Sequence, residues 1–477
     1  MATEEVKNMS KRSDTDKAIH NIMKWLEQPE FQEKHAIVVD EHIAPVCKHL
    51  DLSYEDLNQE IIEHGFDGML FGIMFEDFLG RPLLPDNNNI VDDYLKRRGW
   101  RESVRGRRYL QQLAQSTLSL YEIVEVSPGH YCDVRDIVRG GETIRVLEKM
   151  GTQNLVKWDR IAARILESNG KHIFSGGILP FPQEAAQSLL KVLSKSRKQF
   201  NKEYERLIDK KTRALASVNP DDEFLQNACP FFTSIWLIHT LEGLHAPLPE
   251  MVNYEGDALE FTESRFPFLA EQLEEIASKL DAATGWERDN PDEHTWNWFP
   301  TEQKTKNKAK KGISIQSFQG GQQLISGTLE MSPGVLKLTT NSRERAQRGQ
   351  DKLETLLHGL IGPALSTIQT PEQLLSENET QQQNNGKMEP TDTIDPELAA
   401  QITEDYLDQY YRECLDEPIP VLGDKTPRQC ASRKKDRAKV IEWLKHLENN
   451  ELRRAARQGG KAYDSRWMWE ELKLEKY

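Results

Sequence analysis

Short runs rich in Val, Ile and aromatic residues dominate the chain between Ser119 and Phe181. They read YEIVEV, HYCDV, ETIRVLEK, DRIAARILES and KHIFSGGILPF, and they are separated by Pro-Gly, Gly-Gly and Asn-Gly pairs. Apolar, β-branched runs that alternate with such turn signals are typical of short strands. Five strands joined by short turns have the number and spacing of a small barrel, so the segment predicts an SH3-like or OB-like β-module.

Residues 13 to 117, which precede this module, show a helical pattern. Ser53, with Asp56 three residues later, predicts the N-cap of a helix that ends at Gly65. The next run, GMLFGIMFEDFLG, is apolar on nearly every face. A helix without a polar face is a buried one, so we expect this run at the centre of the N-terminal domain.

After the module, residues 183 to 218 predict one long amphipathic helix that ends before Pro220, since proline cannot continue a helix. A second helix is expected over DDEFLQNACPFFTSIWLIHTLEGL, kinked or broken at Pro230. His239 lies on this apolar run, and the sequence places no carboxylate or nucleophile beside it. We interpret it as a core or boundary histidine.

Further along, LISGTLEM and VLKLTT flank a turn at residues 332–334 and precede an amphipathic helix, which predicts a ββα unit. Asn341, with Glu344 three residues on, has the form of a capping box for that helix. Five lysines before the unit indicate an exposed loop: Lys304, Lys306, Lys308, Lys310 and Lys311. The polar run from Leu375 to Asp395 has no periodic pattern and predicts a linker.

These patterns predict a multidomain α+β protein that is mainly helical, with a small central β-module and a later ββα unit. A chain of 477 residues is too long for one ordinary core. We expect a helical domain over 1–117, the barrel-like module over 118–182, a helical domain over 183–285, the ββα unit with its preceding loop over 286–368, a linker over 369–395 and a basic helical domain over 396–477.

The formal net charge of the chain is -15, and its pI is near 5.4. This average field repels phosphates and anionic membranes, so it argues against a general polyanion binder and leaves local basic patches open. The longest apolar run is far shorter than the roughly 20 residues of a membrane span. Residues 1 to 30 lack the order of a signal peptide. We therefore expect a cytoplasmic protein with no membrane partner.

The five cysteines are far apart and never form a C-x-x-C pair, which fits reduced structural thiols: Cys47, Cys132, Cys229, Cys414 and Cys430. His130 and Cys132, two residues apart on one predicted strand, could supply half of a zinc site. A structural zinc site needs four ligands, and no other compact Cys/His pair lies nearby. We expect a packed cysteine beside a surface histidine, and no metal or cofactor.

Two arginine clusters are candidate anion-binding sites. The first also contains Lys96, Trp100 and Tyr109 and has a single acid, Glu102; its arginines are Arg97, Arg98, Arg101, Arg105, Arg107 and Arg108. The second lies in the first two turns of a predicted helix, where the helix dipole disfavours cations: Arg343, Arg345 and Arg348. For each cluster, a phosphate ligand and pairing with acids of the same chain both remain open.

The C-terminal tail is basic. Residues 425 to 461 contain twelve Lys and Arg and four Asp and Glu, an excess of eight positive charges in an acidic protein. This contrast keeps nucleic acid open as a class of partner.

A motif in the tail resembles a known family. IPVLGDKTPRQCA, a basic stretch and VIEWLKHLE resemble the LGGKTPREA segment and following helix of the toxin-binding C-terminal domain of Xre/MbcA/ParS-type bacterial antitoxins. The resemblance covers residues 415 to 448 and is carried by Leu422, Gly423, Lys425, Thr426, Pro427 and Arg428. Gly423 permits a tight turn, Thr426 suits an N-cap and Pro427 suits the first helical position. No helix-turn-helix domain is recognisable upstream.

A weaker resemblance extends over the body. SLYEIVEVSPGHYCDVRDIVRGG, SGGILPF and the ββα run are similar to large uncharacterised bacterial cytosolic proteins, some of which carry a SEC-C zinc motif. The clustered cysteines of that motif are absent here, so the resemblance implies no zinc.

We therefore expect a non-enzymatic, cytoplasmic binding or regulatory protein. The antitoxin resemblance implies that the basic tail docks a protein partner, with Trp443, Trp467 and Trp469 either as aromatic anchors or as core residues. One alternative is a nucleic-acid-binding protein that uses the two arginine clusters and the tail. Another is a hydrolase with Asp133 and Asp136 near His130, which requires these groups to converge in one pocket. The pattern indicates no particular oligomeric state.

Overall fold

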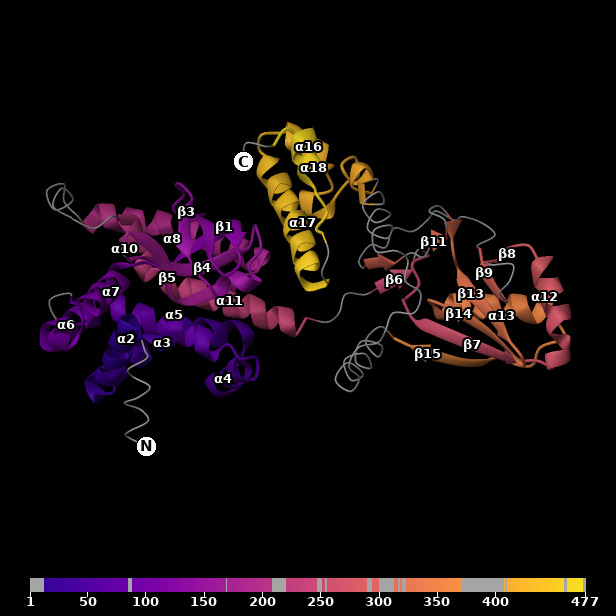
Figure 1. Cartoon of the computed structure of the whole chain (residues 1–477), viewed down its shortest axis with the longest axis horizontal. Helices are drawn as coiled ribbons and strands as arrows, with labels where there is room; N and C mark the ends of the chain where they lie inside the picture. Colours follow the sequence, from indigo (N-terminus) through magenta and orange to yellow (C-terminus); the bar gives the residue numbers. More distant parts are fainter. Residues whose placement is uncertain are drawn as a thin grey trace. The chain divides into compact units, whose positions relative to one another are not determined.

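The computed structural model describes residues 13–84, 88–168, 170–207, 220–246, 251–253, 255–289, 294–299, 313–315, 318–319, 323–370, 407–408, 410–458 and 461–474. The chain divides into two compact units: Met1–His245 with Ile394–Tyr477 (unit 1), and Ala246–Thr393 (unit 2). Each unit combines helices with strands, which confirms the α+β prediction (Figure 1). Over the described part of the chain, no helix is both long and apolar enough to cross a bilayer.

Unit 1 begins with helices. They are α2 (Asp14–Trp25), α3 (Pro29–Leu50), α4 (Tyr54–Glu63), α5 (Asp67–Gly80), α6 (Ile90–Arg98), the 3-10 helix η2 (Gly99–Arg101) and α7 (Val104–Gln115). Ser53 caps α4, since its side chain accepts from the backbone N–H of Asp56 at 3.1 Å, which confirms the predicted start. Leu70, Ile73 and Phe78 of α5 are fully buried, as its apolar sequence predicts.

The five predicted strands form a closed barrel in the order β1-β2-β3-β5-β4, with β3 and β5 parallel and the other pairs antiparallel. They are β1 (Ser119–Ser127), β2 (Tyr131–Asp136), β3 (Ile144–Leu147), β4 (Arg160–Ser168) and β5 (Lys171–Phe181), with the 3-10 helix η3 (Gly151–Asn154) before β4. Gly177 on β5 lets α5 approach closely, because a Cβ there would stand 3.0 Å from the backbone nitrogen of Ile73.

The chain then forms α8 (Gln183–Leu207), α10 (Pro220–Asn227) and α11 (Cys229–Leu244). Residues 208–218 of the predicted long helix lie outside the described residues. Pro230 stands in the first turn of α11, so the predicted break occurs where a missing N–H costs no helical hydrogen bond. Phe232, Trp236 and Leu237 of α11 are buried in one core with α3, α5 and α8.

The last part of unit 1 is a small helical module. It contains η5 (Pro420–Leu422), α16 (Pro427–Ser432), α17 (Arg437–Gln458) and α18 (Arg466–Glu471). Its own core includes Leu415, Leu422, Leu444 and Met468. Residues 396–406 of the predicted basic helical domain lie outside the described residues.

Unit 2 is built on a six-stranded antiparallel sheet in the order β15-β7-β14-β13-β9-β8. The strands are β7 (Phe261–Pro267), β8 (Trp286–Arg288), β9 (Thr295–Trp298), β13 (Gly327–Ser332), β14 (Val335–Thr340) and β15 (Leu365–Gln369). The other elements are η4 (Ala270–Gln272), α12 (Leu273–Asp281), α13 (Arg343–Leu356) and the short pairs β6 (Met251–Asn253) with β10 (Ile313–Ile315), and β11 (Phe318–Gln319) with β12 (Gln323–Leu324).

In this sheet β13, β14 and α13 form the predicted ββα unit. Four strands that were not predicted complete the sheet around it: β7, β8, β9 and β15. The cap of α13 also differs from the prediction, because Ser342 and not Asn341 accepts from the N–H of Arg345, at 3.1 Å. The predicted lysine loop and the linker from Leu375 to Asp395 lie outside the described residues.

Candidate functional site

The first arginine cluster forms the corner where α6 turns into α7. Asn89 caps α6 by accepting from the N–H of Asp92 at 2.8 Å, and Ser103 caps α7 by accepting from the N–H of Gly106 at 3.0 Å. A Cβ on Gly106 would stand 3.0 Å from the Cβ of Ala18, so α7 packs tightly on α2 and its apolar side faces inward. The basic side chains of the run are left on the outside.

All seven cations of this corner are exposed, and we call them the basic corner: Lys96, Arg97, Arg98, Arg101, Arg105, Arg107 and Arg108. Arg97 pairs with Asp93 at 2.9 Å, and the other six have no ion-pair partner among the described residues. Glu102 is buried and accepts from Tyr94 and Asn21, so it neutralises none of them. Trp100 is 74% exposed beneath the guanidinium of Arg101.

The second arginine cluster is paired within unit 2. Arg343 contacts Glu260 at 2.6 Å, and Arg348 contacts both Glu255 and Asp257. Arg345 is 4% exposed; it lies 3.6 Å from Glu255 and donates to the backbone oxygen of Ile325 at 3.3 Å and to Oδ1 of Asn341 at 3.1 Å. Of the two alternatives for this cluster, a phosphate ligand or pairing with acids of the same chain, the structure shows the pairing.

The motif residues of the tail contact other parts of the tail. Lys425 pairs with Asp436 at 2.8 Å, and this contact holds the pKa of that carboxyl below its usual value. Arg428 pairs with Asp416 at 3.0 Å and with Glu471 at 2.8 Å. Leu422 and Pro427 are buried, Gly423 adopts a left-handed conformation with φ 74°, and Thr426 caps α16 as predicted.

Helix α17 of the tail docks on the barrel. Lys445 donates to both carboxylate oxygens of Glu122 at 2.8 and 2.9 Å, and Glu442 accepts from Arg160. Glu448 of the same helix accepts from the indole N–H of Trp158 at 2.7 Å. Asn449 and Arg453 donate to Asp159 at 2.7 and 2.8 Å. Part of the basic charge of the tail is therefore neutralised within unit 1.

The tryptophans of the tail pack on its own core. Trp469 is 9% exposed and stacks on Trp158 with ring centroids 6.1 Å apart. Trp443 and Trp467 are half-buried against the same cluster, and the indole N–H of Trp467 donates to Tyr463 at 2.7 Å. Four exposed cations, three in the turn between α16 and α17 and one in the first turn of α17, have no ion-pair partner among the described residues: Arg433, Lys434, Lys435 and Lys439.

Asp133 and Asp136, the carboxylates of the hydrolase alternative, each bind other side chains of the barrel. Asp133 holds Arg145 through two contacts at 2.8 and 2.7 Å, and the hydrogen bond from Arg145 lowers the pKa of Asp133. Asp136 accepts from Ser119 and from Arg139. His130 lies in the turn before β2 and not on the strand, whereas Cys132 is buried, and burial raises its pKa to about 12.

The cysteines are free thiols, and His239 lies at the edge of the core. None of the five thiols forms a disulfide. His239 is half-buried, with its Nε2 atom 3.0 Å from the hydroxyl of Ser188, which confirms a boundary histidine.

One buried polar cluster was not predicted. His42, Asp77 and Cys229 place their possible metal-ligand atoms within 4.8 Å of one another, the sole such group found among the described residues. Asp77 already contacts Arg81 at 2.7 Å and Arg164 at 3.6 Å. Two guanidinium groups beside the carboxylate take the place of a cation, so the donor set does not fit a metal. Because His42, Asp77 and Cys229 come from three different helices and Arg164 comes from a strand, the sequence offers no local signal for the cluster.

A protein-family model matches part of unit 1. A model of a family of unknown function, DUF7986, matches residues 79–212. This segment is less than a third of the chain and contains the basic corner, the barrel and α8. No curated protein matches the chain.

Proposed function

We propose that the protein binds single-stranded nucleic acid through the basic corner. The observation that supports this proposal is the group of six exposed and unpaired cations around an exposed tryptophan. Guanidinium groups bind phosphates in two-point contacts, and neutralised phosphates release counterions. An exposed indole supplies a surface on which a base stacks.

The charge of the remaining chain restricts where a strand can bind. At a net charge of -15, most of the surface repels a phosphate backbone. The basic corner is an exception that the fold leaves open, while Arg343, Arg345 and Arg348 already have acids as partners. We therefore assign nucleic-acid binding to the basic corner and not to the second cluster.

The proposal includes a finer description of the barrel, as OB-like and not SH3-like. The strand order β1-β2-β3-β5-β4 with a parallel β3–β5 pair supports it, since this is the order of the OB fold. OB folds bind oligonucleotides in many proteins, but the fold alone does not establish that use.

The test is fluorescence anisotropy with a labelled 20-nucleotide poly-dT strand at several salt concentrations. We expect micromolar affinity at low salt and a log-log salt slope of about -0.7 for each phosphate contacted. In the variant Arg98→Gln, Arg101→Gln, Arg105→Gln, Arg108→Gln, affinity falls about 100-fold and the slope loses about 3 units, because four phosphate contacts are removed.

A matched control removes equal charge from the exposed side of α8: Lys191→Gln, Lys195→Gln, Lys198→Gln and Lys202→Gln. Its affinity should change by less than about threefold, since these side chains lie outside the basic corner. Equal losses in both variants would mean that binding follows net charge, and the assignment to the basic corner would fail. An absence of binding at 50 mM salt would refute the function itself.

The antitoxin-like docking of a protein partner by the tail stays a prediction, as does the cytoplasmic location. The turn at Gly423 and the cap at Thr426 support the resemblance in fold. The internal pairing of Lys425 and Arg428 favours the basic corner as the binding surface.

A further inference from the structure

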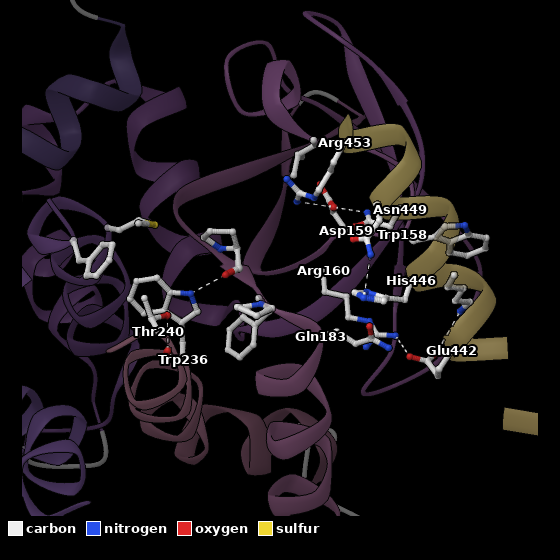
Figure 2. Close-up of a pocket in the computed structure, with 18 residues that line it drawn as sticks. Trp158, Asp159, Arg160, Gln183, Trp236, Thr240, Glu442, His446, Asn449 and Arg453 are labelled. Carbon is white, nitrogen blue, oxygen red and sulfur yellow. Dashed lines mark hydrogen bonds and ion pairs between the residues drawn. The ribbon is translucent and has the colours of Figure 1, made fainter. Parts of the chain in front are cut away.

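A cavity of about 540 Å³ lies inside unit 1, where the end of β5, the start of α8, helix α11 and helix α17 meet (Figure 2). Its size is that of a site for a small organic molecule. The residues that line it come from segments as distant in sequence as Phe66 and Arg453. The cavity is separate from the basic corner, whose residues do not line it.

One side of the cavity is apolar. Phe66, Met69, Phe181 and Trp236 contribute to it, and the rings of Phe66 and Trp236 meet edge to face with centroids 5.2 Å apart. The indole N–H of Trp236 donates to the backbone oxygen of Pro180 at 2.7 Å, as the dashed line in Figure 2 shows. The polar atom of Trp236 is thus occupied, and this side suits a hydrocarbon or aromatic body.

The opposite side carries an incompletely paired arginine. Arg160 is 8% exposed, and its Nη2 atom contacts Glu442 of α17 and Glu122 of β1. Its Nε and Nη1 atoms are buried and have no hydrogen-bond partner. Buried N–H groups are almost always paired in folded proteins, so these two donors indicate a missing acceptor.

The same side also holds the beginning of α8. Pro182 and Gln183 line the cavity, and the first N–H groups of a helix have no acceptor within the helix. Figure 2 shows the side chain of Arg160 between Gln183 and Glu442. A helix N-terminus beside a guanidinium group favours an anion, because both present N–H donors and positive charge.

We propose that this cavity binds a small carboxylic acid with an apolar body. The carboxylate accepts from Arg160 and the start of α8, and the body packs on Phe66, Met69 and Trp236. A carboxylate fits better than a phosphate, because Asp159 and Glu442 also line the cavity and would repel a second negative charge. The proposal is independent of nucleic-acid binding at the basic corner.

The test is isothermal titration calorimetry of the full chain with decanoate, and with decanol as the neutral match. We expect decanoate to bind at least tenfold more tightly than decanol. In Arg160→Met the preference for the acid disappears. In Arg453→Met, which removes an equal charge from the same cavity but from a side chain paired with Asp159, the preference remains.

A second variant keeps the test decisive if Arg160→Met does not fold. Thr240→Phe fills the cavity from α11 without removing a charge, and we expect it to abolish binding of both ligands while the melting temperature is kept. Equal affinity of the wild-type protein for decanoate and decanol would overturn the proposal. Failure of decanoate to bind, or an unchanged preference for the acid in a folded Arg160→Met protein, would overturn it as well.

Discussion

The basic corner and the Arg343–Arg348 cluster are alike in residue type, but their surroundings differ. The second cluster meets Glu255, Asp257 and Glu260, which come from the segment leading into β7. In the basic corner the nearby acid, Glu102, is turned inward to Tyr94 and Asn21. The difference shows that the acids brought close by the fold decide whether an arginine cluster is paired or left exposed.

Two arginines that meet on one buried carboxylate sharpen this contrast and give the largest expected effect. Arg81 and Arg164 both contact Asp77, which is 2% exposed. Asp77→Asn should lower the free energy of unfolding by about 3–5 kcal/mol at pH 7, because it leaves two guanidinium groups under-compensated in the interior. Urea unfolding measures this difference, and a loss below 1 kcal/mol would contradict it.

The same variant has a defined pH dependence. Burial acts to raise the pKa of Asp77, but the hydrogen bond from His42 and the charges of Arg81 and Arg164 hold this pKa below its usual value. The unfolded chain therefore binds the proton more readily, so the stabilisation is complete above about pH 4 and is lost as the pH falls through the folded pKa. The stability gap between wild type and Asp77→Asn should close in acid. A stability gap that widens in acid would mean that folding raises the pKa of Asp77.

Within the second cluster, Arg345 should matter more to stability than its neighbours. Arg345→Met removes a buried cation that contacts Glu255, Ile325 and Asn341, and we expect a loss of about 3 kcal/mol. Hydrogen exchange of α13 and β14 reports this loss locally. Arg343→Met is the control, since Arg343 is 63% exposed and a surface pair contributes about 0–1 kcal/mol. Equal losses of stability in Arg345→Met and Arg343→Met would contradict the expected difference between the buried and the exposed arginine.

The cap of α13 gives a smaller effect. Ser342→Ala should cost about 1–2 kcal/mol, because Ser342 accepts from the N–H of Arg345 and is fully buried. Glu344→Ala should change stability by less than about 0.5 kcal/mol, since Glu344 is exposed. The reverse order, in the same exchange measurement, would restore the predicted capping box at Asn341 and Glu344.

The smallest stability effect is expected in the basic corner. Trp100→Ala should change the free energy of unfolding by less than about 0.5 kcal/mol, since the side chain is 74% exposed. If a base stacks on Trp100, the same change weakens binding of the poly-dT strand by about 1–3 kcal/mol. Unfolding and anisotropy on one preparation separate the two effects, and an unchanged affinity would remove Trp100 from the interface.

The sequence alone was enough for the elements whose signals are local. The five barrel strands, the cap at Ser53, the break at Pro230 and the start of α16 at Thr426 each follow from a few neighbouring residues. Turn residues, caps and prolines act on the backbone within one or two turns of the chain, so their effect is visible in the sequence.

The surroundings of charged side chains were decided by the tertiary structure. Arg160 faces a cavity lined by residues from Phe66 to Arg453, Asp77 meets Arg164 from β4, and the strand β7 pairs with β14 more than 60 residues later. Whether a cation is paired, buried or open depends on the dielectric and the partners that distant segments bring to it. The sequence therefore determined which residues carry charge in this protein, and the packing within each unit determined which of those charges are left unpaired and exposed.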